Sequence, residues 1–391
     1  MIDGNRPVFL IHQSPQKYAV LPDFLRKVFM KHKDDVQLGT IISLFTMSPN
    51  KAEEYISACS RYSDIIIVDL TTHLIYENKG IPKRYKKHYS LLSEEPPQKP
   101  KKGWINRVLS KQREFGATIL LSPSIAVLNT SKPQALLDVQ LDWLKETEDL
   151  LKKGEQLFFN LTLESSWLSD KRHLEILLNN LIDLDTKDIY LRVRWPAMQP
   201  RYGQLRDNKI LEGYKEICNF ASSESRALIL PTTGLTGWFL TALGASGFSI
   251  GLSKDQQSYS EDLIIRRQKD APSIPRKMRY FERQLLHTIE LPTHDALLDL
   301  KETKPCQCEF CKALEANEPN RKTAWDYSLA SLHQIRHTVD LTAQLNVKNP
   351  RATALKEVQN ALSYKKAITD RIKLIGENNP QHLEVWERIL A

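Results

Sequence analysis

Eight short apolar runs, separated by stretches with helical periodicity, constrain the fold of this chain more than any other feature. The runs are rich in β-branched residues and almost continuously apolar, as in "DIIIVDL" and "ATILLSPS". Runs of this kind are typical of parallel strands whose two faces are both covered. The expected strands occupy residues 7–13, 38–46, 64–70, 117–124, 156–164, 188–195, 226–233 and 247–253.

Eight strands that alternate with helices predict an α/β fold, a closed (β/α)8 barrel rather than an open doubly wound sheet. No G-x-G-x-x-G motif follows the first strand, which argues against a dinucleotide-binding fold. We assign residues 1–300 to the barrel, with a Pro- and Lys-rich insertion at about 76–115. Residues 301–347 are expected to form a subdomain around a cysteine cluster, and residues 348–391 a C-terminal helical extension.

The composition and the N-terminal sequence bear on the cellular compartment. Hydrophobic residues make up 41% of the chain and charged residues 26%, which is ordinary for a globular protein with a packed core. No stretch approaches the roughly 20 apolar residues of a membrane span. The sequence "MIDGNRPVFLIHQS" lacks the basic segment and long apolar run of a signal peptide. We therefore expect a cytoplasmic protein without membrane contact.

The charge distribution favours a polyanionic partner. The net charge is +8, and five basic runs occur, four of which contain or adjoin an aromatic residue. Cations that neutralise phosphates, together with rings that stack on bases, are typical of nucleic-acid binding. Solvated lysine-rich surface is the alternative for any single run. The runs occupy residues 83–88, 99–104, 192–202, 264–269 and 275–283.

Three of the five cysteines, Cys306, Cys308 and Cys311, lie within six residues in "KPCQCEFCKAL". In a chain without a secretory signal, this spacing predicts a structural zinc site rather than disulfides. A closed tetrahedral site needs a fourth donor. His333 and His337, four residues apart on one expected helix face, are both candidates. A redox role for the Cys308/Cys311 pair is less favoured, because no thioredoxin-like βαβ pattern surrounds it.

A barrel followed by C-x-C-x-x-C and a later helical histidine resembles the tRNA-guanine transglycosylase superfamily, over residues 1 to about 347. In that family the zinc histidine stands 26 residues after the last cysteine and precedes a short apolar helix ending in Gln-Leu. Here this position is His337, in "RHTVDLTAQL". The resemblance therefore implies a structural Zn²⁺ bound by Cys306, Cys308, Cys311 and His337.

The resemblance also implies an enzyme that cleaves the bond between base and sugar. Asp69, in "IIIVDLTTHLIY", takes the place of the family's acid/base aspartate, but the Ser-Gly-Gly-Phe that follows it in the family is absent. In "GASGFSIGLS", Ser249 stands where the family has its nucleophilic aspartate, and Gly247 replaces the aspartate before it. Serine is a poor substitute for a carboxylate nucleophile at an oxocarbenium-like carbon. We therefore expect hydrolysis, in which Asp69 activates water or stabilises the cation.

The superfamily includes members that act on DNA, among them phage-defence glycosylases that remove modified bases. The preferred interpretation is a DNA glycosylase acting on modified bases, with phage DNA as the expected substrate and DNA favoured over tRNA as the partner. One alternative is base exchange that inserts a 7-deazaguanine into DNA or tRNA. Another is a non-catalytic subunit that binds nucleic acid.

Further candidates lie at the expected strand ends, where the catalytic groups of such barrels gather. Glu164 is a second candidate acid, and Asp255 a candidate replacement for the missing nucleophile. Arg192 and Arg194 alternate on one strand, so both are expected to point into the upper barrel and to require carboxylates or a substrate phosphate. The remaining candidates for substrate binding are His73, Ser249, and Thr232 and Thr233 of "PTTG", a stretch expected to offer free backbone N–H groups to a phosphate.

Overall fold

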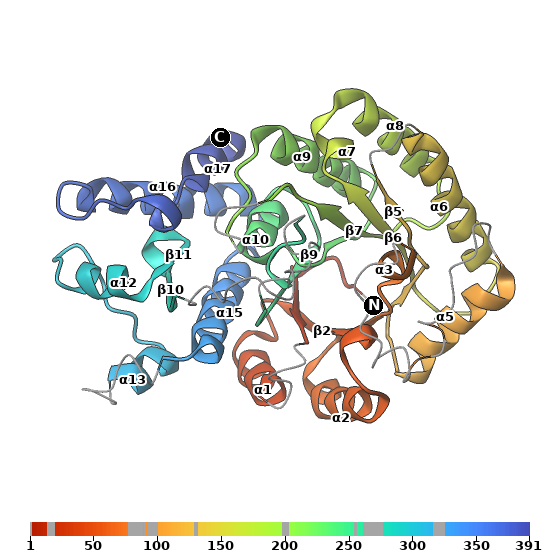
Figure 1. Ribbon diagram of the computed structural model, residues 1–391, viewed down its shortest axis with the longest axis horizontal. Coiled ribbons are helices and arrows are strands. Elements are labelled where there is room, and N and C mark those ends of the chain that lie inside the picture. Colours follow the sequence, from red (N-terminus) through yellow and green to blue (C-terminus); the bar gives the residue numbers. More distant parts are fainter. Residues whose placement is uncertain are drawn as a thin grey trace, which may run out of the picture.

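The structure is a computed structural model of the 391-residue chain. It describes residues 2–13, 20–76, 89, 91, 101–128, 132–197, 203–253, 256–260, 277–315 and 325–391. The barrel occupies the N-terminal two thirds of the chain, and the C-terminal elements pack against one side of it (Figure 1).

All eight expected strands are present and all are parallel. They are β1 (Val8–His12), β2 (Gln37–Ser43), β3 (Ile65–Asp69), β4 (Leu120–Leu121), β6 (Leu157–Glu164), β7 (Ile189–Arg194), β8 (Leu228–Leu230) and β9 (Gly247–Gly251). Their order in the sheet is β3-β2-β1-β9-β8-β7-β6-β4, and a short extra strand, β5 (Ala126–Val127), pairs with β6. A parallel bridge between Ile67 and Ile119 joins β3 to the residue before β4 and closes the ring. The (β/α)8 barrel predicted from the sequence is therefore confirmed.

The interior of the barrel changes from apolar to polar along the strands. Side chains that alternate along each strand form the inner cluster Val8, Leu10, Ile41, Ile65, Ile67, Ile119, Leu121, Phe158, Tyr190 and Ile229. Two residues further along the same inner faces come polar side chains. Because successive side chains of a strand point to opposite faces, His12, Ser43, Asp69 and Arg192 continue the inner rows at the carboxyl ends of their strands. We call this end of the barrel the mouth.

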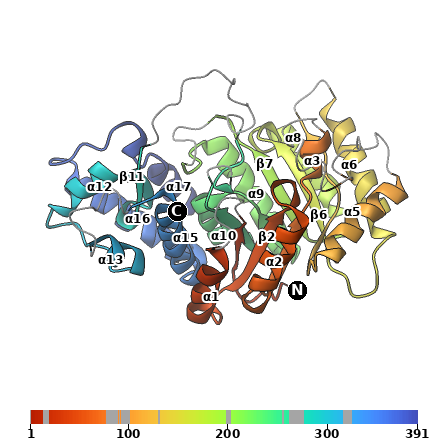
Figure 2. The same cartoon turned by 60° about the horizontal axis from the view of Figure 1, so that its bottom comes forward.

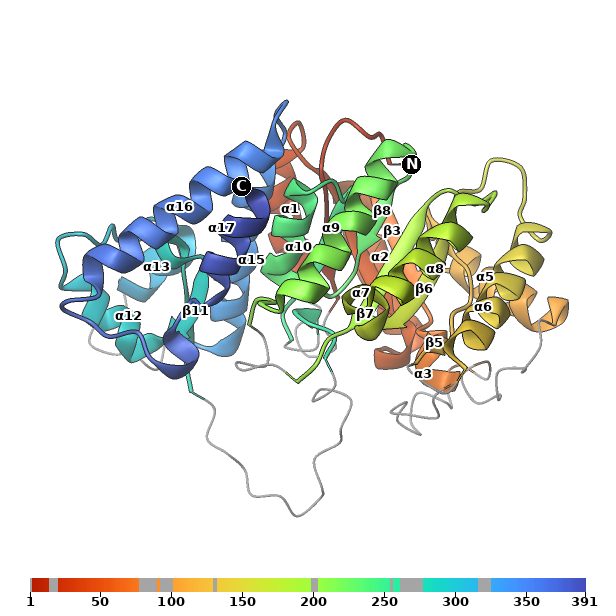
Figure 3. The same cartoon turned by 90° about the horizontal axis from the view of Figure 1, so that it is seen from above.

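Helices surround the barrel in the order that the alternating pattern predicts (Figure 1). They are α1 (Leu21–His32), α2 (Pro49–Cys59), α5 (Lys102–Glu114), α6 (Pro133–Glu148), α7 (Ser166–Ser169), α8 (Lys171–Ile182), α9 (Asn208–Ser223) and α10 (Gly234–Ala242). Figure 3 shows α8, α9 and α10 along one side of the barrel. A short α3 (Thr72–Tyr76) follows β3. The position after β9 is filled by α15 (Tyr327–Ala343), which contacts α1, α10 and β9. The last barrel helix therefore comes from beyond the cysteine cluster.

Part of the stretch predicted as an insertion belongs to the barrel itself. Within residues 76–115, α5 buries Trp104, Ile105, Val108 and Leu109 against the barrel core and contacts β3 and β4. It is the crossover helix between those strands. The Pro- and Lys-rich character of the neighbouring sequence concealed its amphipathic pattern. Apart from Tyr89 and Leu91, residues 77–100 lie outside the described part of the chain.

A second unit lies beside α1, α10 and α15 (Figure 2). It contains the antiparallel hairpin β10 (Arg279–Glu282) and β11 (His287–Glu290), with α12 (Leu291–Leu298), α13 (Glu309–Glu315), α16 (Pro350–Ile368) and α17 (His382–Leu390). The hairpin precedes residue 300 but packs with the cysteine region, since Tyr280 shares a buried cluster with Cys311 and Trp325. In the described part of the chain, no helix combines the length and apolar character that a membrane span requires.

Candidate functional site

Asp69 ends β3 at the mouth of the barrel and is 1% exposed. Arg192 Nη2 donates to its Oδ2 across 2.5 Å, and the backbone N–H of Thr71 donates to its Oδ1 across 2.7 Å. Thr71 has a φ of 48°, so the chain turns sharply after the strand and points its N–H back at the carboxylate. The Tyr190 hydroxyl also donates to Oδ2, at 3.4 Å. The carboxylate is thus held on both oxygens, and one of its partners is a buried guanidinium.

The same guanidinium organises its surroundings. Arg192 Nη1 donates to Thr162 Oγ1 at 3.1 Å and lies 3.3 Å from Nδ1 of His73. Burial, together with the charge of Arg192, holds the pKa of His73 well below its usual range. His73 is therefore neutral at neutral pH and accepts at Nδ1. The structure places His73 in the buried mouth rather than on the loop surface.

Glu164 and Arg194 form the second ion pair of the mouth, between the ends of β6 and β7. Arg194 Nε lies 3.1 Å from Glu164 Oε2, and Nη2 contacts the same oxygen. Both side chains are nearly buried. Arg192 and Arg194, the two arginines of β7, thus pair with carboxylates. Carboxylates are the first of the two kinds of anion that the sequence predicted for them. Both acidic groups described at the mouth are engaged by arginine.

The "PTTG" stretch differs from the prediction. Thr232 has a φ of 52°, and its backbone N–H donates to the Ser249 hydroxyl at 2.8 Å. The N–H of Thr233 donates to the Ser249 backbone oxygen at 3.3 Å. The sequence led us to expect that these two N–H groups would be free for a phosphate. Both are instead occupied by Ser249. The positive φ turns the loop back onto β9, which the sequence pattern could not reveal.

Residues 256–260 cross the mouth after β9. The backbone N–H of Trp195 donates to the Tyr259 backbone oxygen at 2.8 Å, and Trp195 forms a parallel bridge with Ser260. The Tyr259 ring stands edge-on to His73, with 5.8 Å between the ring centroids. This segment brings an aromatic ring over the mouth. Asp255, the candidate replacement nucleophile, lies outside the described residues.

Sequence reasoning missed one pair in the mouth, His12 and Ser43. His12 Nε2 lies 2.7 Å from Ser43 Oγ, between the ends of the adjacent strands β1 and β2. Both side chains are buried, at 5% and 2% exposure. Burial lowers the pKa of His12 to about 4; Asp69 opposes this shift and Arg192 adds to it. The available signal was positional, because both residues end apolar strands on the inner-facing register.

The cysteine cluster and α15 form a candidate metal centre. Donor atoms of four residues lie within 4.8 Å of one another: Cys306, Cys308, His333 and His337. Cys306 Sγ is 3.1 Å from His337 Nε2, and Cys308 Sγ is 3.3 Å from His333 Nδ1. A tetrahedral zinc ion with usual bond lengths separates S and N ligands by about 3.5 Å. The donor set thus fits a metal ion of this kind.

Cys306, Cys308 and His337 are among the four ligands that the resemblance implied, and His333 is the additional donor. His333 Nε2 lies 3.1 Å from the backbone oxygen of Phe281. A ring nitrogen that donates to a carbonyl leaves the other nitrogen free as a ligand. The predicted ligand Cys311 stays beside the group, with its Sγ 3.7 Å from His333 Nδ1 and 3.1 Å from the Tyr280 hydroxyl. Five donors therefore surround one position that takes four.

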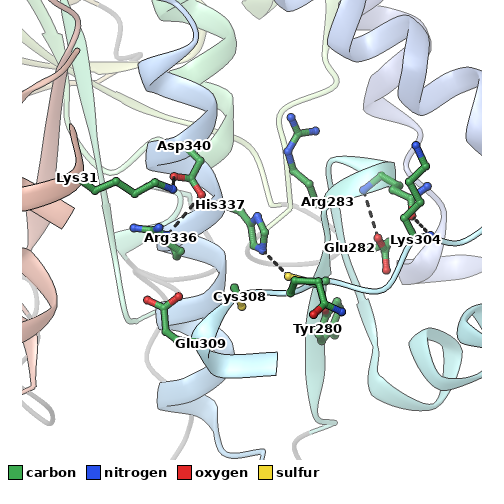
Figure 4. Close-up of a pocket in the computed structure, with 13 residues that line it drawn as sticks. Lys31, Tyr280, Glu282, Arg283, Lys304, Cys308, Glu309, Arg336, His337 and Asp340 are labelled. Carbon is green, nitrogen blue, oxygen red and sulfur yellow. Dashed lines mark hydrogen bonds and ion pairs between the residues drawn. The ribbon is translucent and has the colours of Figure 1, made fainter. Parts of the chain in front are cut away.

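The cluster borders a cavity of about 440 Å³ (Figure 4). Cys306, Cys308 and His337 line it from one side. The pKa of His337 is raised to about 9, because hydrogen bonds with the two cysteine sulfurs outweigh the opposing effect of burial. The charged residues at the rim include Lys31 and Asp340, which pair with each other at 2.9 Å.

Apart from Lys101, the described cations of the basic runs also contact carboxylates. Arg192 and Arg194 point into the barrel and contribute no surface charge. The others pair as follows: Lys102 with Asp149, Lys277 with Glu290, Arg279 with Glu377, and Arg283 with Glu357. The runs at 83–88 and 264–269 lie outside the described residues. The expectation of a nucleic-acid partner therefore depends mainly on those two runs.

Comparison with protein-family models gives no match, and comparison with curated proteins gives none. Among solved structures, one similar chain is (S)-3-O-geranylgeranylglyceryl phosphate synthase from Thermoplasma acidophilum in complex with sn-glycerol-1-phosphate. It is 10% identical with a TM-score of 0.32, over 64% of this chain and 85% of that chain. Another is wild-type GGGPS from Thermoplasma volcanium, 13% identical with a TM-score of 0.31, over 64% and 86%. Similarity at this level carries no argument about function.

Proposed function

We propose that this chain is an enzyme that hydrolyses N-glycosidic bonds in nucleic acid, as a DNA glycosylase acting on modified bases. The observation that carries the proposal is the position of Asp69. Its carboxylate lies at the mouth of an eight-stranded barrel, fixed by Arg192 and by the Thr71 N–H. The proposal also draws on the resemblance to the tRNA-guanine transglycosylase superfamily, which depends on the Cys/His cluster that follows the barrel.

The chemistry follows from the charge that develops during bond cleavage. When a base leaves, the sugar carbon and ring oxygen acquire positive charge, as in glycoside hydrolysis. A fixed carboxylate next to this carbon stabilises the cation without reorganising during the reaction. Ser249, at the position of the family's nucleophile, accepts a hydrogen bond from Thr232 and brings no carboxylate. Water is therefore the nucleophile in this proposal, and an abasic site is the product.

We assign the metal centre a structural role and zinc as its ion. Cys306, Cys308, His333 and His337 would hold it, with Cys311 as the fifth available donor. Bound zinc supplies a crosslink between the cysteine segment and α15. Because α15 is also the last helix of the barrel, this crosslink stabilises the barrel through that helix.

Two alternatives remain as proposals. Base exchange would incorporate a labelled 7-deazaguanine into DNA or tRNA in place of leaving an abasic site. A non-catalytic nucleic-acid-binding subunit is favoured by one observation, the pairing of both mouth carboxylates, Asp69 with Arg192 and Glu164 with Arg194. Such pairing is also what a purely structural ion-pair network would contain.

The test incubates the purified chain with duplex and single-stranded DNA carrying different modified bases, and with tRNA. Mass spectrometry then detects free base and abasic sugar. The proposal predicts both products from DNA, and their loss in Asp69→Asn, which keeps the shape of the side chain. A chain that binds DNA equally well with either residue but releases no base is the non-catalytic subunit.

A further inference from the structure

We propose that His12 is the general base that activates the attacking water, and that Ser43 is the residue that positions its imidazole. The inference rests on the proposed hydrolysis and adds a named proton acceptor to it. Neither residue was a sequence candidate, and neither takes part in the ion pairs of the mouth.

The strand register places this pair beside Asp69. On β1, His12 follows Val8 and Leu10 in the inner row; on β2, Ser43 follows Ile41. Ser43 and Asp69 are register partners on the adjacent strands β2 and β3. His12 is the register partner of Ile41, one inner position before Ser43, and its Nε2 reaches Ser43 Oγ across 2.7 Å. The imidazole therefore faces the same space as the carboxylate.

One nitrogen of His12 has no partner. Nε2 is 2.7 Å from Ser43 Oγ, while the buried Nδ1 has no hydrogen-bond partner among the described residues. Buried N–H groups without an acceptor are rare, so we assign the proton to Nε2, which donates to Ser43. This tautomer leaves a lone pair on Nδ1. A buried polar atom in this state is a site for a water or a substrate group.

The other ionisable groups of the mouth are less suited to accept a proton. Asp69 and Glu164 each accept hydrogen bonds from an arginine, so oxygens of both carboxylates already have a partner. His73 is neutral, but its Nδ1 already faces Arg192. His12 is neutral above the pKa of about 4 that its burial imposes. Its basicity is therefore close to that of the carboxylates that activate water in inverting glycosidases.

The step balances as follows. The water oxygen bonds to the anomeric carbon as the bond between that carbon and the base nitrogen breaks, and the electron pair leaves with the base. The proton of the water moves to His12 Nδ1. The departing base takes a proton from solvent, and His12 later releases its own proton to solvent. Asp69 takes no part in the proton transfer, and its carboxylate stabilises the cationic carbon.

The test compares single-turnover base release by the wild-type chain, His12→Gln and His173→Gln. A glutamine amide can replace Nε2–H toward Ser43 but offers no lone pair at the position of Nδ1. We expect His12→Gln to slow release by roughly 10²- to 10⁴-fold, the usual contribution of a general base. Affinity for the oligonucleotide should stay the same. His173, on the outer helix α8, is the matched control and should retain the wild-type rate.

Two further readouts separate chemistry from folding. Imidazole added to His12→Gly should restore part of the rate, and Ser43→Thr should retain more activity than Ser43→Ala. The wild-type rate should also fall as the pH drops through about 4, and His12→Gln should lack this step. Asp69 and Arg192 are the charged groups that act on the imidazole, and the adjacent β9 contributes none.

The outcomes are distinguishable. Base release at the wild-type rate by His12→Gln, with Asp69→Asn inactive, overturns the role of His12 and leaves the proposed function in place. Loss of activity without rescue by imidazole, together with a lowered melting temperature, assigns His12 a structural role and also overturns it. A wild-type chain that releases no base removes the proposed function, and the inference with it.

Discussion

Arg192 Nη2 and Asp69 Oδ2 lie 2.5 Å apart inside the upper barrel, with side chains that are 4% and 1% exposed. The pair joins β3 to β7 across the mouth, rather than between neighbouring strands. Two charges are stable at such a depth only when each has its counter-charge and its remaining hydrogen bonds. This relationship sets both the stability and the electrostatics of the proposed site.

Removing the arginine alone should be severe. Arg192→Met leaves Asp69 buried without a counter-charge, and such changes cost about 3–5 kcal/mol. Urea unfolding measures the free energy of unfolding. The double variant Arg192→Met/Asp69→Asn should recover most of the loss, because no unpaired charge remains. Arg26→Met, which breaks an exposed pair with Asp23, is the control and should cost less than about 1 kcal/mol. Equal costs at positions 192 and 26 would contradict the buried pair.

The metal centre predicts one bound ion per chain. Cys308→Ser and His337→Ala each remove a donor, so elemental analysis should find the metal lost or well below one equivalent. Chelation of the wild-type chain should lower the melting temperature, because α15 loses its link to the cysteine segment. Cys59→Ala removes a thiol outside the cluster and should retain the metal. Full metal content in both cluster variants would contradict the site.

The fourth ligand can be identified by comparing His333→Ala with Cys311→Ser. The geometry predicts that His333→Ala weakens metal binding more, since its Nδ1 is 3.3 Å from Cys308 Sγ and its other nitrogen is fixed by Phe281. Cobalt substitution gives a second readout, because its charge-transfer bands depend on the number of thiolates. Bands that weaken in Cys311→Ser, with His333→Ala unchanged, would assign three cysteines and one histidine.

Acid should destabilise the folded chain progressively below about pH 6.5. Burial lowers the pKa of His12 to about 4 and that of His287 to about 3. In the unfolded chain both titrate near 6.5, so the unfolded state binds protons first as the pH falls. The contribution of these two histidines to the free energy of unfolding is therefore full above about pH 6.5. It is lost as the pH falls through their folded-state pKa values of about 4 and 3. At about 1.4 kcal/mol per pKa unit, His12 accounts for about 3 kcal/mol. Urea unfolding of the wild type and of His12→Gln across pH 3–8 measures this contribution. An equal dependence of the free energy of unfolding on pH in both proteins would contradict the lowered pKa of His12.

Gly247 is required for close approach of β1 and β9. A Cβ at this position would lie 2.3 Å from the backbone oxygen of Val8. Gly247→Ala should therefore destabilise the fold by roughly 1–3 kcal/mol, the usual range for overpacking. Gly103→Ala on α5 meets nothing within 4 Å and should be neutral or stabilising by up to about 1 kcal/mol. Thermal unfolding of the two variants should thus change in opposite directions or differ clearly in size.

The barrel was predictable because each strand is a local signal. The run "DIIIVDL" is apolar on both faces, and its buried position in β3 follows directly from that pattern. Helix α15 was different: its sequence predicts a helix, but nothing local says that it fills the last position of the barrel. The ring of helices is completed by α15 through its contacts with α1, α10 and β9, which are distant from it in sequence.

The site was predictable only where a strand end carried a charged residue. Asp69, Arg192 and Arg194 could be placed by alternation along their strands, and the partners of the two arginines could be narrowed to carboxylates or a substrate phosphate. The hydrogen bonds of the Thr232 and Thr233 N–H groups could not be predicted, because they depend on a left-handed backbone turn. His12 and Ser43 look like ordinary strand-end residues until the register of β1 and β2 brings them within 2.7 Å.

The central claim is that Asp69 at the barrel mouth enables cleavage of a base from its sugar. The most direct measurement is quantitative mass spectrometry of free base released from modified-base DNA by wild type and Asp69→Asn, both verified as folded. The account predicts base and abasic sugar in equal amounts from the wild type, and a rate at least about 100-fold lower from the variant. Equal release by both proteins, or release by neither, would contradict it.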